Sequence, residues 1–506
     1  MELLPTGTTF KASAKMLTFL VRRGRGMAAL LAAPPRFAIE PVGVGGYEPR
    51  HGPDDPRANV VTAAPPPAAP AGRQASLRNI LLNTGWMLGG KGVSAALSLV
   101  YLAIVTRALG VEGFGQFTLA LGIGQAVAGL CSFQSWQIIV RYGMPHLHAG
   151  RDAALARLVR FATLLDVASA LFGAVLVAAG VLLLGDRFGW TAAFQAEAVA
   201  ASILLVLSMH WTPIGILRLH DRFATAELCD ALTPIGRFLG ALAVWAAGPS
   251  VIGFLVVWAL AEAITAIAYW IAAVRFGKVR WRLGEPLRWN TLARENEGLI
   301  GYTATTNLAS SLDLGGKQLA VLLVGLIVAP AAAGGFRLAQ QLAQALAKLS
   351  QLLARAIFPE LVRSRAADAG GNADFDRLLR RTVRMSAVGA GIVFLALLLI
   401  GRPVLGLIAG EEFLYVFPVL LVLGTAAAID FAAVGFEPAL IALGRPGLAL
   451  KLRFVATAVL LALMLILPRW LGSIGAALAI LAGSIASYLL LWRIVRARLG
   501  RGAPSH

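Results

Sequence analysis

The chain has 506 residues, of which 58% are hydrophobic and only 14% are charged. A soluble domain is about half apolar and about one quarter charged, so these proportions exclude a soluble globular protein and indicate a membrane protein. The net charge is +19. Most basic residues lie in short stretches between apolar runs and do not alternate with aromatic residues, which argues against a nucleic-acid partner.

Residues 1–75 form the first segment and differ from the rest of the chain. Residues 63–72 are almost entirely Ala and Pro. Such a composition buries too little apolar surface to fold. We therefore expect either a disordered cytoplasmic extension or a stretch that results from a wrongly assigned start codon.

From Ile80 onward, apolar runs long enough to cross a bilayer follow one another closely. A bilayer core requires about 20 apolar residues per helix, and the runs predict about twelve transmembrane helices in an all-α polytopic membrane protein. We place them at residues 80–106, 115–140, 161–184, 195–217, 231–248, 251–274, 299–325, 332–358, 383–400, 413–431, 449–468 and 472–494. The two cysteines, Cys131 and Cys229, lack metal-ligand spacing, so we expect neither a disulfide nor a metal site.

Basic residues are concentrated in every second loop between these spans. The alternate loops contain little more than Arg107, Arg187, Arg402 and Arg469. The positive-inside rule places the loops rich in Lys and Arg in the cytoplasm. We therefore expect a multi-pass protein of a bacterial inner membrane with both termini in the cytoplasm.

The two halves of the chain show a weak internal repeat at an offset of 219 residues. Residues 117–120 (FTLA) fall on residues 336–339 (FRLA), and polar positions of the first two spans fall on polar positions of the seventh and eighth. Such an offset predicts two six-helix lobes, related as a parallel repeat, around a central cavity. The predicted lobes are residues 76–274 and 299–500, and a basic cytoplasmic linker at residues 275–298 joins them.

A polar stripe on the eighth span is the strongest single feature of the sequence. Six residues at spacings of 4, 3, 4, 3 and 4 share one face of a helix. They are Arg337, Gln341, Gln344, Lys348, Gln351 and Arg355. One interpretation is the cationic wall of a water-filled cavity that receives an anion, since a charge facing lipid costs several kcal/mol. In the other, the two arginines snorkel to the membrane surfaces while the glutamines pack between helices. The depth of Lys348 favours the cavity.

Other spans also contain polar residues. Lys91 lies near the middle of the first span, where it either has a functional role or serves as the counter-ion of an acid elsewhere. Arg237 is either a further intramembrane cation or the mark of a cytoplasmic helix end. Asp313 and Lys317 lie four residues apart in the seventh span, where they either pair with each other or bind substrate or protons. The acids that we consider for coupling to an ion gradient are Asp166, Glu262, Asp313 and Asp430.

Three short segments of the chain carry a resemblance to a known family. They are residues 106–115 (TRALGVEGFG), residues 335–361, which begin GFRLA and end IFPEL, and residues 472–478 (GSIGAAL). In this order and spacing they resemble polysaccharide flippases of the Wzx type, within the multidrug/oligosaccharidyl-lipid/polysaccharide exporter superfamily. Each motif alone is short and apolar, and the resemblance covers residues 76–500.

The resemblance implies two six-helix lobes around a central cavity and transport by alternating access. The implied substrate is a polyprenyl-pyrophosphate-linked oligosaccharide, flipped to the outer leaflet for surface polysaccharide synthesis. Its implied partners are membrane lipids and other polysaccharide-assembly proteins, with no cofactor. From helical periodicity, and not from a family motif, we assign the substrate anion to Lys91, Lys317, Arg337, Lys348 and Arg355. The polar lining of the cavity is assigned to Asn83, Gln125, Asp313, Gln341, Gln344 and Gln351.

Other classes of membrane protein remain as alternatives. A multidrug or cation antiporter on the same fold needs buried acids where this chain carries a basic stripe. A membrane enzyme, such as a polysaccharide polymerase, needs a sizeable outer loop or an acidic pair, and the longest predicted outer loop spans only residues 401–412. A non-transporting scaffold gains nothing from charges in the middle of a bilayer. We therefore expect a transporter and not an enzyme.

Overall fold

The computed structural model describes residues 73–277, 288–344, 373–433, 436 and 446–499. Within these ranges every regular element is a helix and no strand occurs, which confirms the all-α prediction. Eight helices in this part of the chain are long and apolar enough to cross a membrane. The predicted N-terminal extension lies outside the described residues, except for residues 73–75, which begin the first described helix.

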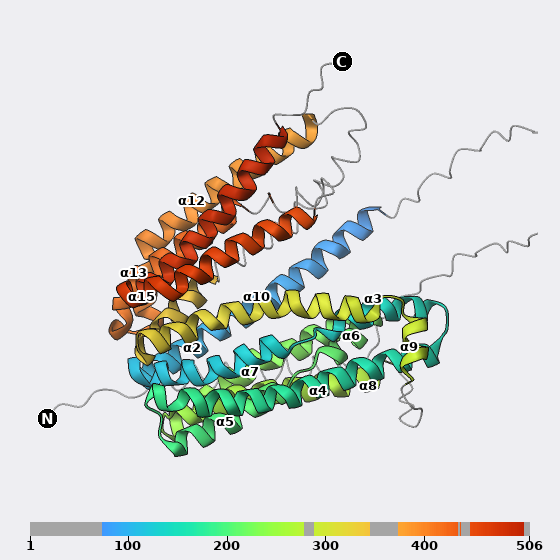
Figure 1. Cartoon of the computed structure of the whole chain (residues 1–506), viewed down its shortest axis with the longest axis horizontal. Helices are drawn as coiled ribbons and strands as arrows, with labels where there is room; N and C mark the ends of the chain where they lie inside the picture. The colour runs from blue at the N-terminus through green and yellow to red at the C-terminus, as the bar shows by residue number, and fades with distance from the viewer. Residues whose placement is uncertain (1–72, 278–287, 345–372, 434–435, 437–445, 500–506) are drawn as a thin grey trace, which may run out of the picture. The chain divides into compact units, whose positions relative to one another are not determined.

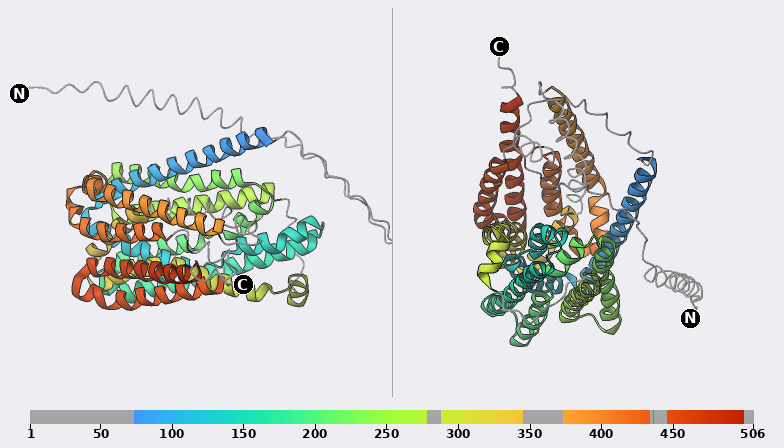
Figure 2. Two further views of the ribbon diagram at one scale, coloured as in Figure 1. Left: turned by 90° about the horizontal axis from the view of Figure 1, so that it is seen from above. Right: turned by 90° about the vertical axis from the view of Figure 1, so that its right-hand side faces the viewer.

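The first group of helices covers the predicted spans one to six. It comprises α2 (Arg73–Cys131), α3 (Ser135–His148), α4 (Asp152–Gly185), α5 (Ala192–Leu207), α6 (Trp211–Leu219), α7 (Phe223–Ala247) and α8 (Val251–Phe276), with the short 3-10 helix η1 (Asp186–Phe188) after α4. Capping residues start two of them, because the Thr191 hydroxyl accepts a hydrogen bond from Phe194 N and that of Ser250 from Gly253 N. Neighbouring helices α4, α5 and α8 lie side by side (Figure 2).

The second group follows the predicted linker. It comprises α9 (Trp289–Glu295), α10 (Leu299–Ile327), a helix over residues 330–344, α12 (Ala373–Ala409), η2 (Glu411–Val416), α13 (Phe417–Ala432) and α15 (Pro446–Leu499). Helices α12, α13 and α15 pack together (Figure 1). The short helix α9 lies within the predicted linker and is tied to α4 by an ion pair between Arg157 and Glu295.

Tight glycine turns join several of the consecutive spans in both groups. Helix α2 is kinked at Gly110 and α15 at Gly472, where φ is +64° and +59°. Glycines with positive φ also end α4–η1 (Gly189), α7 (Gly248) and α12 (Gly410). An L-residue with a side chain adopts this left-handed backbone only at a cost, so glycine permits the chain to reverse within a few residues. These turns coincide with the predicted loops that carry few basic residues.

Two predicted spans are interrupted, contrary to the sequence prediction of continuous helices. The predicted span 115–140 breaks at residues 132–134, and the predicted span 195–217 breaks at residues 208–210. At the first break, the freed carbonyl of Cys131 accepts a hydrogen bond from Ser169, and that of Ser132 accepts one from Asn307 at 3.1 Å. Neighbouring helices thus satisfy backbone groups that a continuous helix pairs internally, as a membrane setting requires.

The core joins the first group of helices to the second. Helix α10 packs along α2, and the largest cluster of buried residues draws on both groups. Phe114, Phe336 and Phe413 are almost fully buried, and the rings of Phe114 and Phe413 meet edge to face at 5.8 Å. The two groups of helices are therefore closely packed against each other around these three phenylalanines.

Candidate functional site

Helix 330–344 carries the described part of the polar stripe. It approaches the segment of α2 after Gly110 very closely, because Gly115 and Gly334 meet without side chains. A Cβ atom on Gly115 would lie 2.4 Å from the carbonyl oxygen of Pro330, and one on Gly334 would lie 3.0 Å from Gly115 Cα. This approach brings Arg337, one turn further along the helix, against α2.

The Arg337 side chain is buried, with 5% of its surface exposed, and it binds two amide oxygens. Its Nη2 donates to Gln125 Oε1 on α2 at 2.8 Å, and its Nη1 donates to Gln318 Oε1 on α10 at 3.2 Å. Both partners are neutral, so they orient the guanidinium without balancing its charge. Within the described residues no carboxylate pairs with Arg337. A buried cation without a counter-charge is costly, and such an arrangement is typical of a site that receives an anion.

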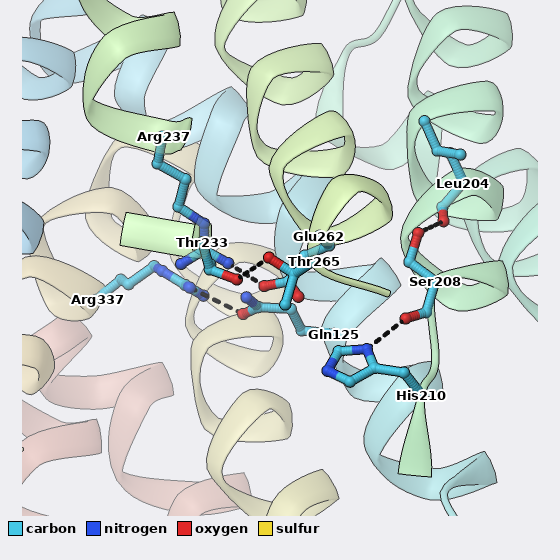
Figure 3. Close-up of polar contacts among 9 residues, drawn as sticks. All are labelled: Gln125, Leu204, Ser208, His210, Thr233, Arg237, Glu262, Thr265 and Arg337. Carbon is cyan, nitrogen blue, oxygen red and sulfur yellow. Dashed lines mark hydrogen bonds and ion pairs between the residues drawn. The ribbon is translucent and has the colours of Figure 1, made fainter. Parts of the chain in front are cut away.

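A second arginine, Arg237, lies close to the first. It projects from α7, forms an ion pair with Glu262 of α8, and has its guanidinium 3.4 Å from the ring centroid of Trp258. The two arginines are near enough to influence each other electrostatically. Figure 3 shows their side chains, from different helices, pointing into the same region. The sequence left open whether Arg237 marks a helix end, and the structure places it in the middle of α7.

Tyr101 of α2 completes the group. Its ring packs edge to face on Trp258 at 5.7 Å, and its hydroxyl lies within electrostatic range of both arginines. The residue is only 4% exposed, yet the hydroxyl has no hydrogen-bond partner among the described residues. We call this group the arginine cluster, and its members are Tyr101, Gln125, Arg237, Trp258, Glu262, Gln318 and Arg337. Two guanidinium groups and one carboxylate give it one positive charge in excess.

The cluster contains only some of the residues predicted to bind substrate. Arg337 and Gln125 are joined directly, whereas Gln341 is half-buried and Gln344 is exposed. Lys348, Gln351 and Arg355 lie outside the described residues. The side chains of Asn83, Lys91, Asp313 and Lys317 also lie outside the described part of the structure. The roles assigned to these residues stay predictions.

Asp166 occupies a separate polar centre at the two helix breaks. Its carboxylate accepts hydrogen bonds from Ser135 Oγ at 2.8 Å, from Thr212 Oγ1 at 2.7 Å and from the backbone N–H of Thr212 at 2.9 Å. Ser135 and Thr212 stand in the first turns of α3 and α6. A carboxylate at the positive end of a helix is stabilised there, so Asp166 ties both interrupted spans to α4.

The other acids considered for ion coupling lie in different surroundings. Glu262 belongs to the arginine cluster as the partner of Arg237. Asp430, close to the end of α13, accepts a hydrogen bond from Ser484 of α15. Groups of three or more side chains suited to hold a metal ion do not occur among the described residues. Ion coupling through these acids stays a prediction.

Sequence reasoning missed Tyr101, Trp258 and Gln318 as members of the cluster. A lone Tyr, Trp or Gln in an apolar span carries no periodic signal, because each residue type also occurs as an ordinary packing residue. Only the pairing of Arg237 with an acid was open to inference, since α7 and α8 are consecutive helices. The meeting of Arg237 with Arg337, 100 residues later, depends on tertiary packing.

Comparison with known proteins identifies the family of the chain. A family described as polysaccharide biosynthesis proteins matches residues 80–365, more than half of the chain. The inner membrane protein YghQ of Escherichia coli (strain K12) is 28% identical over 352 residues, which are 67% of this chain and 95% of that protein.

Solved structures show the same fold at low sequence identity. An inward-facing multidrug resistance MATE transporter of the MOP superfamily aligns with a TM-score of 0.60 and 14% identity, over 80% of this chain and 94% of that chain. The lipid II flippase MurJ aligns with a TM-score of 0.59 and 12% identity, over 81% and 87%. Both confirm the predicted twelve-helix polytopic fold. The chain therefore belongs to the polysaccharide biosynthesis protein family and has the membrane-transporter fold of MATE proteins and MurJ.

Proposed function

We propose that the protein flips a polyprenyl-pyrophosphate-linked oligosaccharide from the cytoplasmic to the outer leaflet of a bacterial inner membrane by alternating access. The product would supply the synthesis of a surface polysaccharide, such as lipopolysaccharide, capsule or exopolysaccharide. Membership of the polysaccharide biosynthesis family supports this proposal. The fold shared with a lipid II flippase and the inner-membrane relative support it further. Both termini would lie in the cytoplasm, together with the basic loops.

The burial of Arg337 is the single observation that carries the choice of substrate. Its guanidinium is held by two amide oxygens, and its charge has no carboxylate partner in the described part of the chain. Arginine binds phosphate through two parallel N–H groups, which makes it well suited to a pyrophosphate. A multidrug or cation antiporter would need the opposite charge at this place. The excess positive charge of the arginine cluster therefore favours an anionic substrate.

Replacement of Arg337 by Gln tests the proposal in cells. We expect the Arg337→Gln variant, expressed in a strain that lacks the native gene, to lower surface polysaccharide by at least about tenfold, equivalent to about 1.4 kcal/mol. Lipid-linked repeat units should accumulate on the cytoplasmic side, because the cation that binds the pyrophosphate is lost. The measurement is the amount of surface glycan together with that of lipid-linked glycan.

A matched variant controls for general effects of losing an arginine. Arg402 on α12 is exposed, so Arg402→Gln removes the same charge away from the cluster and should restore export fully. Both variants must reach the membrane in wild-type amount. If the gene deletion leaves surface glycan unchanged, or makes lipid-linked glycan scarce, the flippase proposal is wrong. In that case a cation antiporter or a membrane enzyme becomes the better explanation.

A further inference from the structure

Three polar pairs, which follow one another along the two helices, join α7 to α8. The Tyr269 hydroxyl donates to Asp230 at 2.6 Å, the hydroxyls of Thr233 and Thr265 lie 2.8 Å apart, and Arg237 pairs with Glu262. In the first two pairs, each polar group has a hydrogen-bond partner on the other helix. The third pair differs, because hydrogen-bond donors at or near it have no acceptor among the described residues.

Two buried hydrogen-bond donors near the Arg237–Glu262 pair have no acceptor among the described residues. Arg237 Nε is buried and has no hydrogen-bond partner among the described residues, although Nη2 of the same guanidinium contacts Glu262. The Tyr101 hydroxyl, near the same guanidinium, is unpartnered as well. Buried donors without acceptors are uncommon in folded proteins and each costs about 1–3 kcal/mol. Two of them beside two cations indicate a place built for an anion with several acceptor oxygens.

The position of Arg237 suits an exchange of partners. Trp258 lies under the plane of its guanidinium at 3.4 Å and holds it in one orientation. The side chains of Arg237 and Glu262 keep 18% and 23% of their surface exposed, so neither side chain is fully enclosed. A carboxylate and a phosphate bind a guanidinium fork in the same geometry, and they therefore compete for it.

We propose that in the substrate-free protein Glu262 occupies the place on Arg237 that a phosphate group of the substrate takes during transport. Tyr101 and Arg337 supply the remaining donors of this phosphate site. The inference rests on the proposed function and adds to it a second cation, a hydroxyl donor and an internal competitor. While the site is empty, Glu262 balances the charge of Arg237, and the charge of Arg337 stays without a carboxylate partner among the described residues.

Calorimetry on the purified full-length protein tests this exchange. The probe is the pyrophosphate diester of citronellol and glucose, which lacks the phosphate proton that titrates near neutral pH in a monoester. Titration at one constant pH gives the affinity of each variant for the probe. The Glu262→Gln variant should bind about tenfold more tightly than the wild type, because the competitor is gone.

A second variant tests the hydroxyl donor. Tyr101→Phe removes one oxygen atom, and we expect about tenfold weaker binding, since a hydrogen bond to a charged group is lost. Tyr415→Phe is the matched control, because Tyr415 lies outside the cluster and its hydroxyl contacts the Ala331 carbonyl. Its affinity should equal that of the wild type. Glu262→Asp keeps the competing carboxylate, so its affinity should lie closer to that of the wild type than to that of Glu262→Gln.

Several results would overturn the inference. These are an affinity of Glu262→Gln that is equal to or weaker than that of the wild type, or wild-type affinity in Tyr101→Phe. A protein that exports lipid-linked glycan in cells but gives any of these results keeps the proposed function and loses the exchange. If the cellular test fails while the calorimetric differences appear, the site binds a pyrophosphate diester but serves another substrate.

Discussion

The Asp166 carboxylate and the Arg337 guanidinium are both buried, but their surroundings differ. Asp166 accepts three hydrogen bonds at the first turns of two helices, and these stabilise its negative charge. Arg337 donates hydrogen bonds only to neutral amide oxygens, which orient the guanidinium without balancing its charge. The first arrangement is sufficient for a structural role, whereas the second calls for a ligand. In the sequence, Asp166 is a lone acid near an apolar run, whereas Arg337 begins a periodic polar stripe.

Loss of the Asp166 acceptor should destabilise the protein. In Asp166→Ala, the hydroxyls of Ser135 and Thr212 and the Thr212 N–H lose their partner, which we expect to cost about 2–5 kcal/mol. Thermal unfolding of the purified protein, followed by loss of helix, measures the effect. Asp166→Asn keeps one acceptor oxygen, so its stability should lie between those of the wild type and Asp166→Ala. Wild-type stability of Asp166→Ala combined with loss of transport would instead assign Asp166 to ion coupling.

At this scale the sequence predicts part of the site. The spacing of Arg337, Gln341 and Gln344 predicts a polar face, and the structure buries Arg337 against Gln125. The cavity that this face is predicted to line stays a prediction. Partners such as Gln318 and Tyr101 could not be predicted, because the contacts come from other helices. A residue acquires a role here from its neighbours in space, and a single sequence does not list them.

Helices approach each other most closely where both carry glycine at the crossing point. Gly115 on α2 and Gly334 on helix 330–344 permit backbone contact, and this contact places Arg337 against Gln125. The sequence shows these glycines within apolar runs but not which of them face each other. It does predict the turns near Gly189 and Gly410, because apolar runs stop there. It missed the breaks at residues 132–134 and 208–210, where the apolar pattern continues across the interruption.

Adding one methyl group at the crossing should separate the two helices. We expect Gly115→Ala to destabilise the protein by about 1–3 kcal/mol, because the new Cβ meets the backbone at Pro330 and cannot be relieved by a rotamer change. Gly92→Ala on the same helix is the control. No atom lies within 4 Å of that added Cβ, so it should be neutral or stabilising by up to about 1 kcal/mol. Thermal unfolding compares them, and equal midpoints would show that the crossing is looser than described.

Besides the apolar seam around Phe114, Phe336 and Phe413, polar contacts join the two groups of helices. Arg107 Nη2 donates to the Leu407 carbonyl at 2.6 Å, Asn307 donates to the Ser132 carbonyl, and Arg337 donates to Gln125. Each such bond contributes about 0.5–1.5 kcal/mol, so all three can break during a conformational change. Weak ties of this kind suit alternating access, in which the groups must separate at one end at a time.

At the scale of the molecule the sequence was most informative. Apolar run lengths predict the twelve-helix fold, since the bilayer fixes how long a spanning helix must be. The polysaccharide biosynthesis family agrees with the resemblance found in the short motifs. The boundaries of the two lobes stay a prediction, although the glycine turns at Gly189 and Gly248 in the first group have counterparts at Gly410 and Gly472 in the second.

Transbilayer movement of a lipid-linked substrate in proteoliposomes tests the central proposal most directly. A fluorescent polyprenyl pyrophosphate diester is placed in both leaflets, and a membrane-impermeant quencher reports the fraction that reaches the outer leaflet. We expect wild type and Arg402→Gln to move it much faster than protein-free liposomes, and Arg337→Gln to be slower than wild type by at least about tenfold. Movement by the wild type no faster than in protein-free liposomes would contradict the flippase proposal, and equal rates for wild type and Arg337→Gln would remove Arg337 from the substrate site.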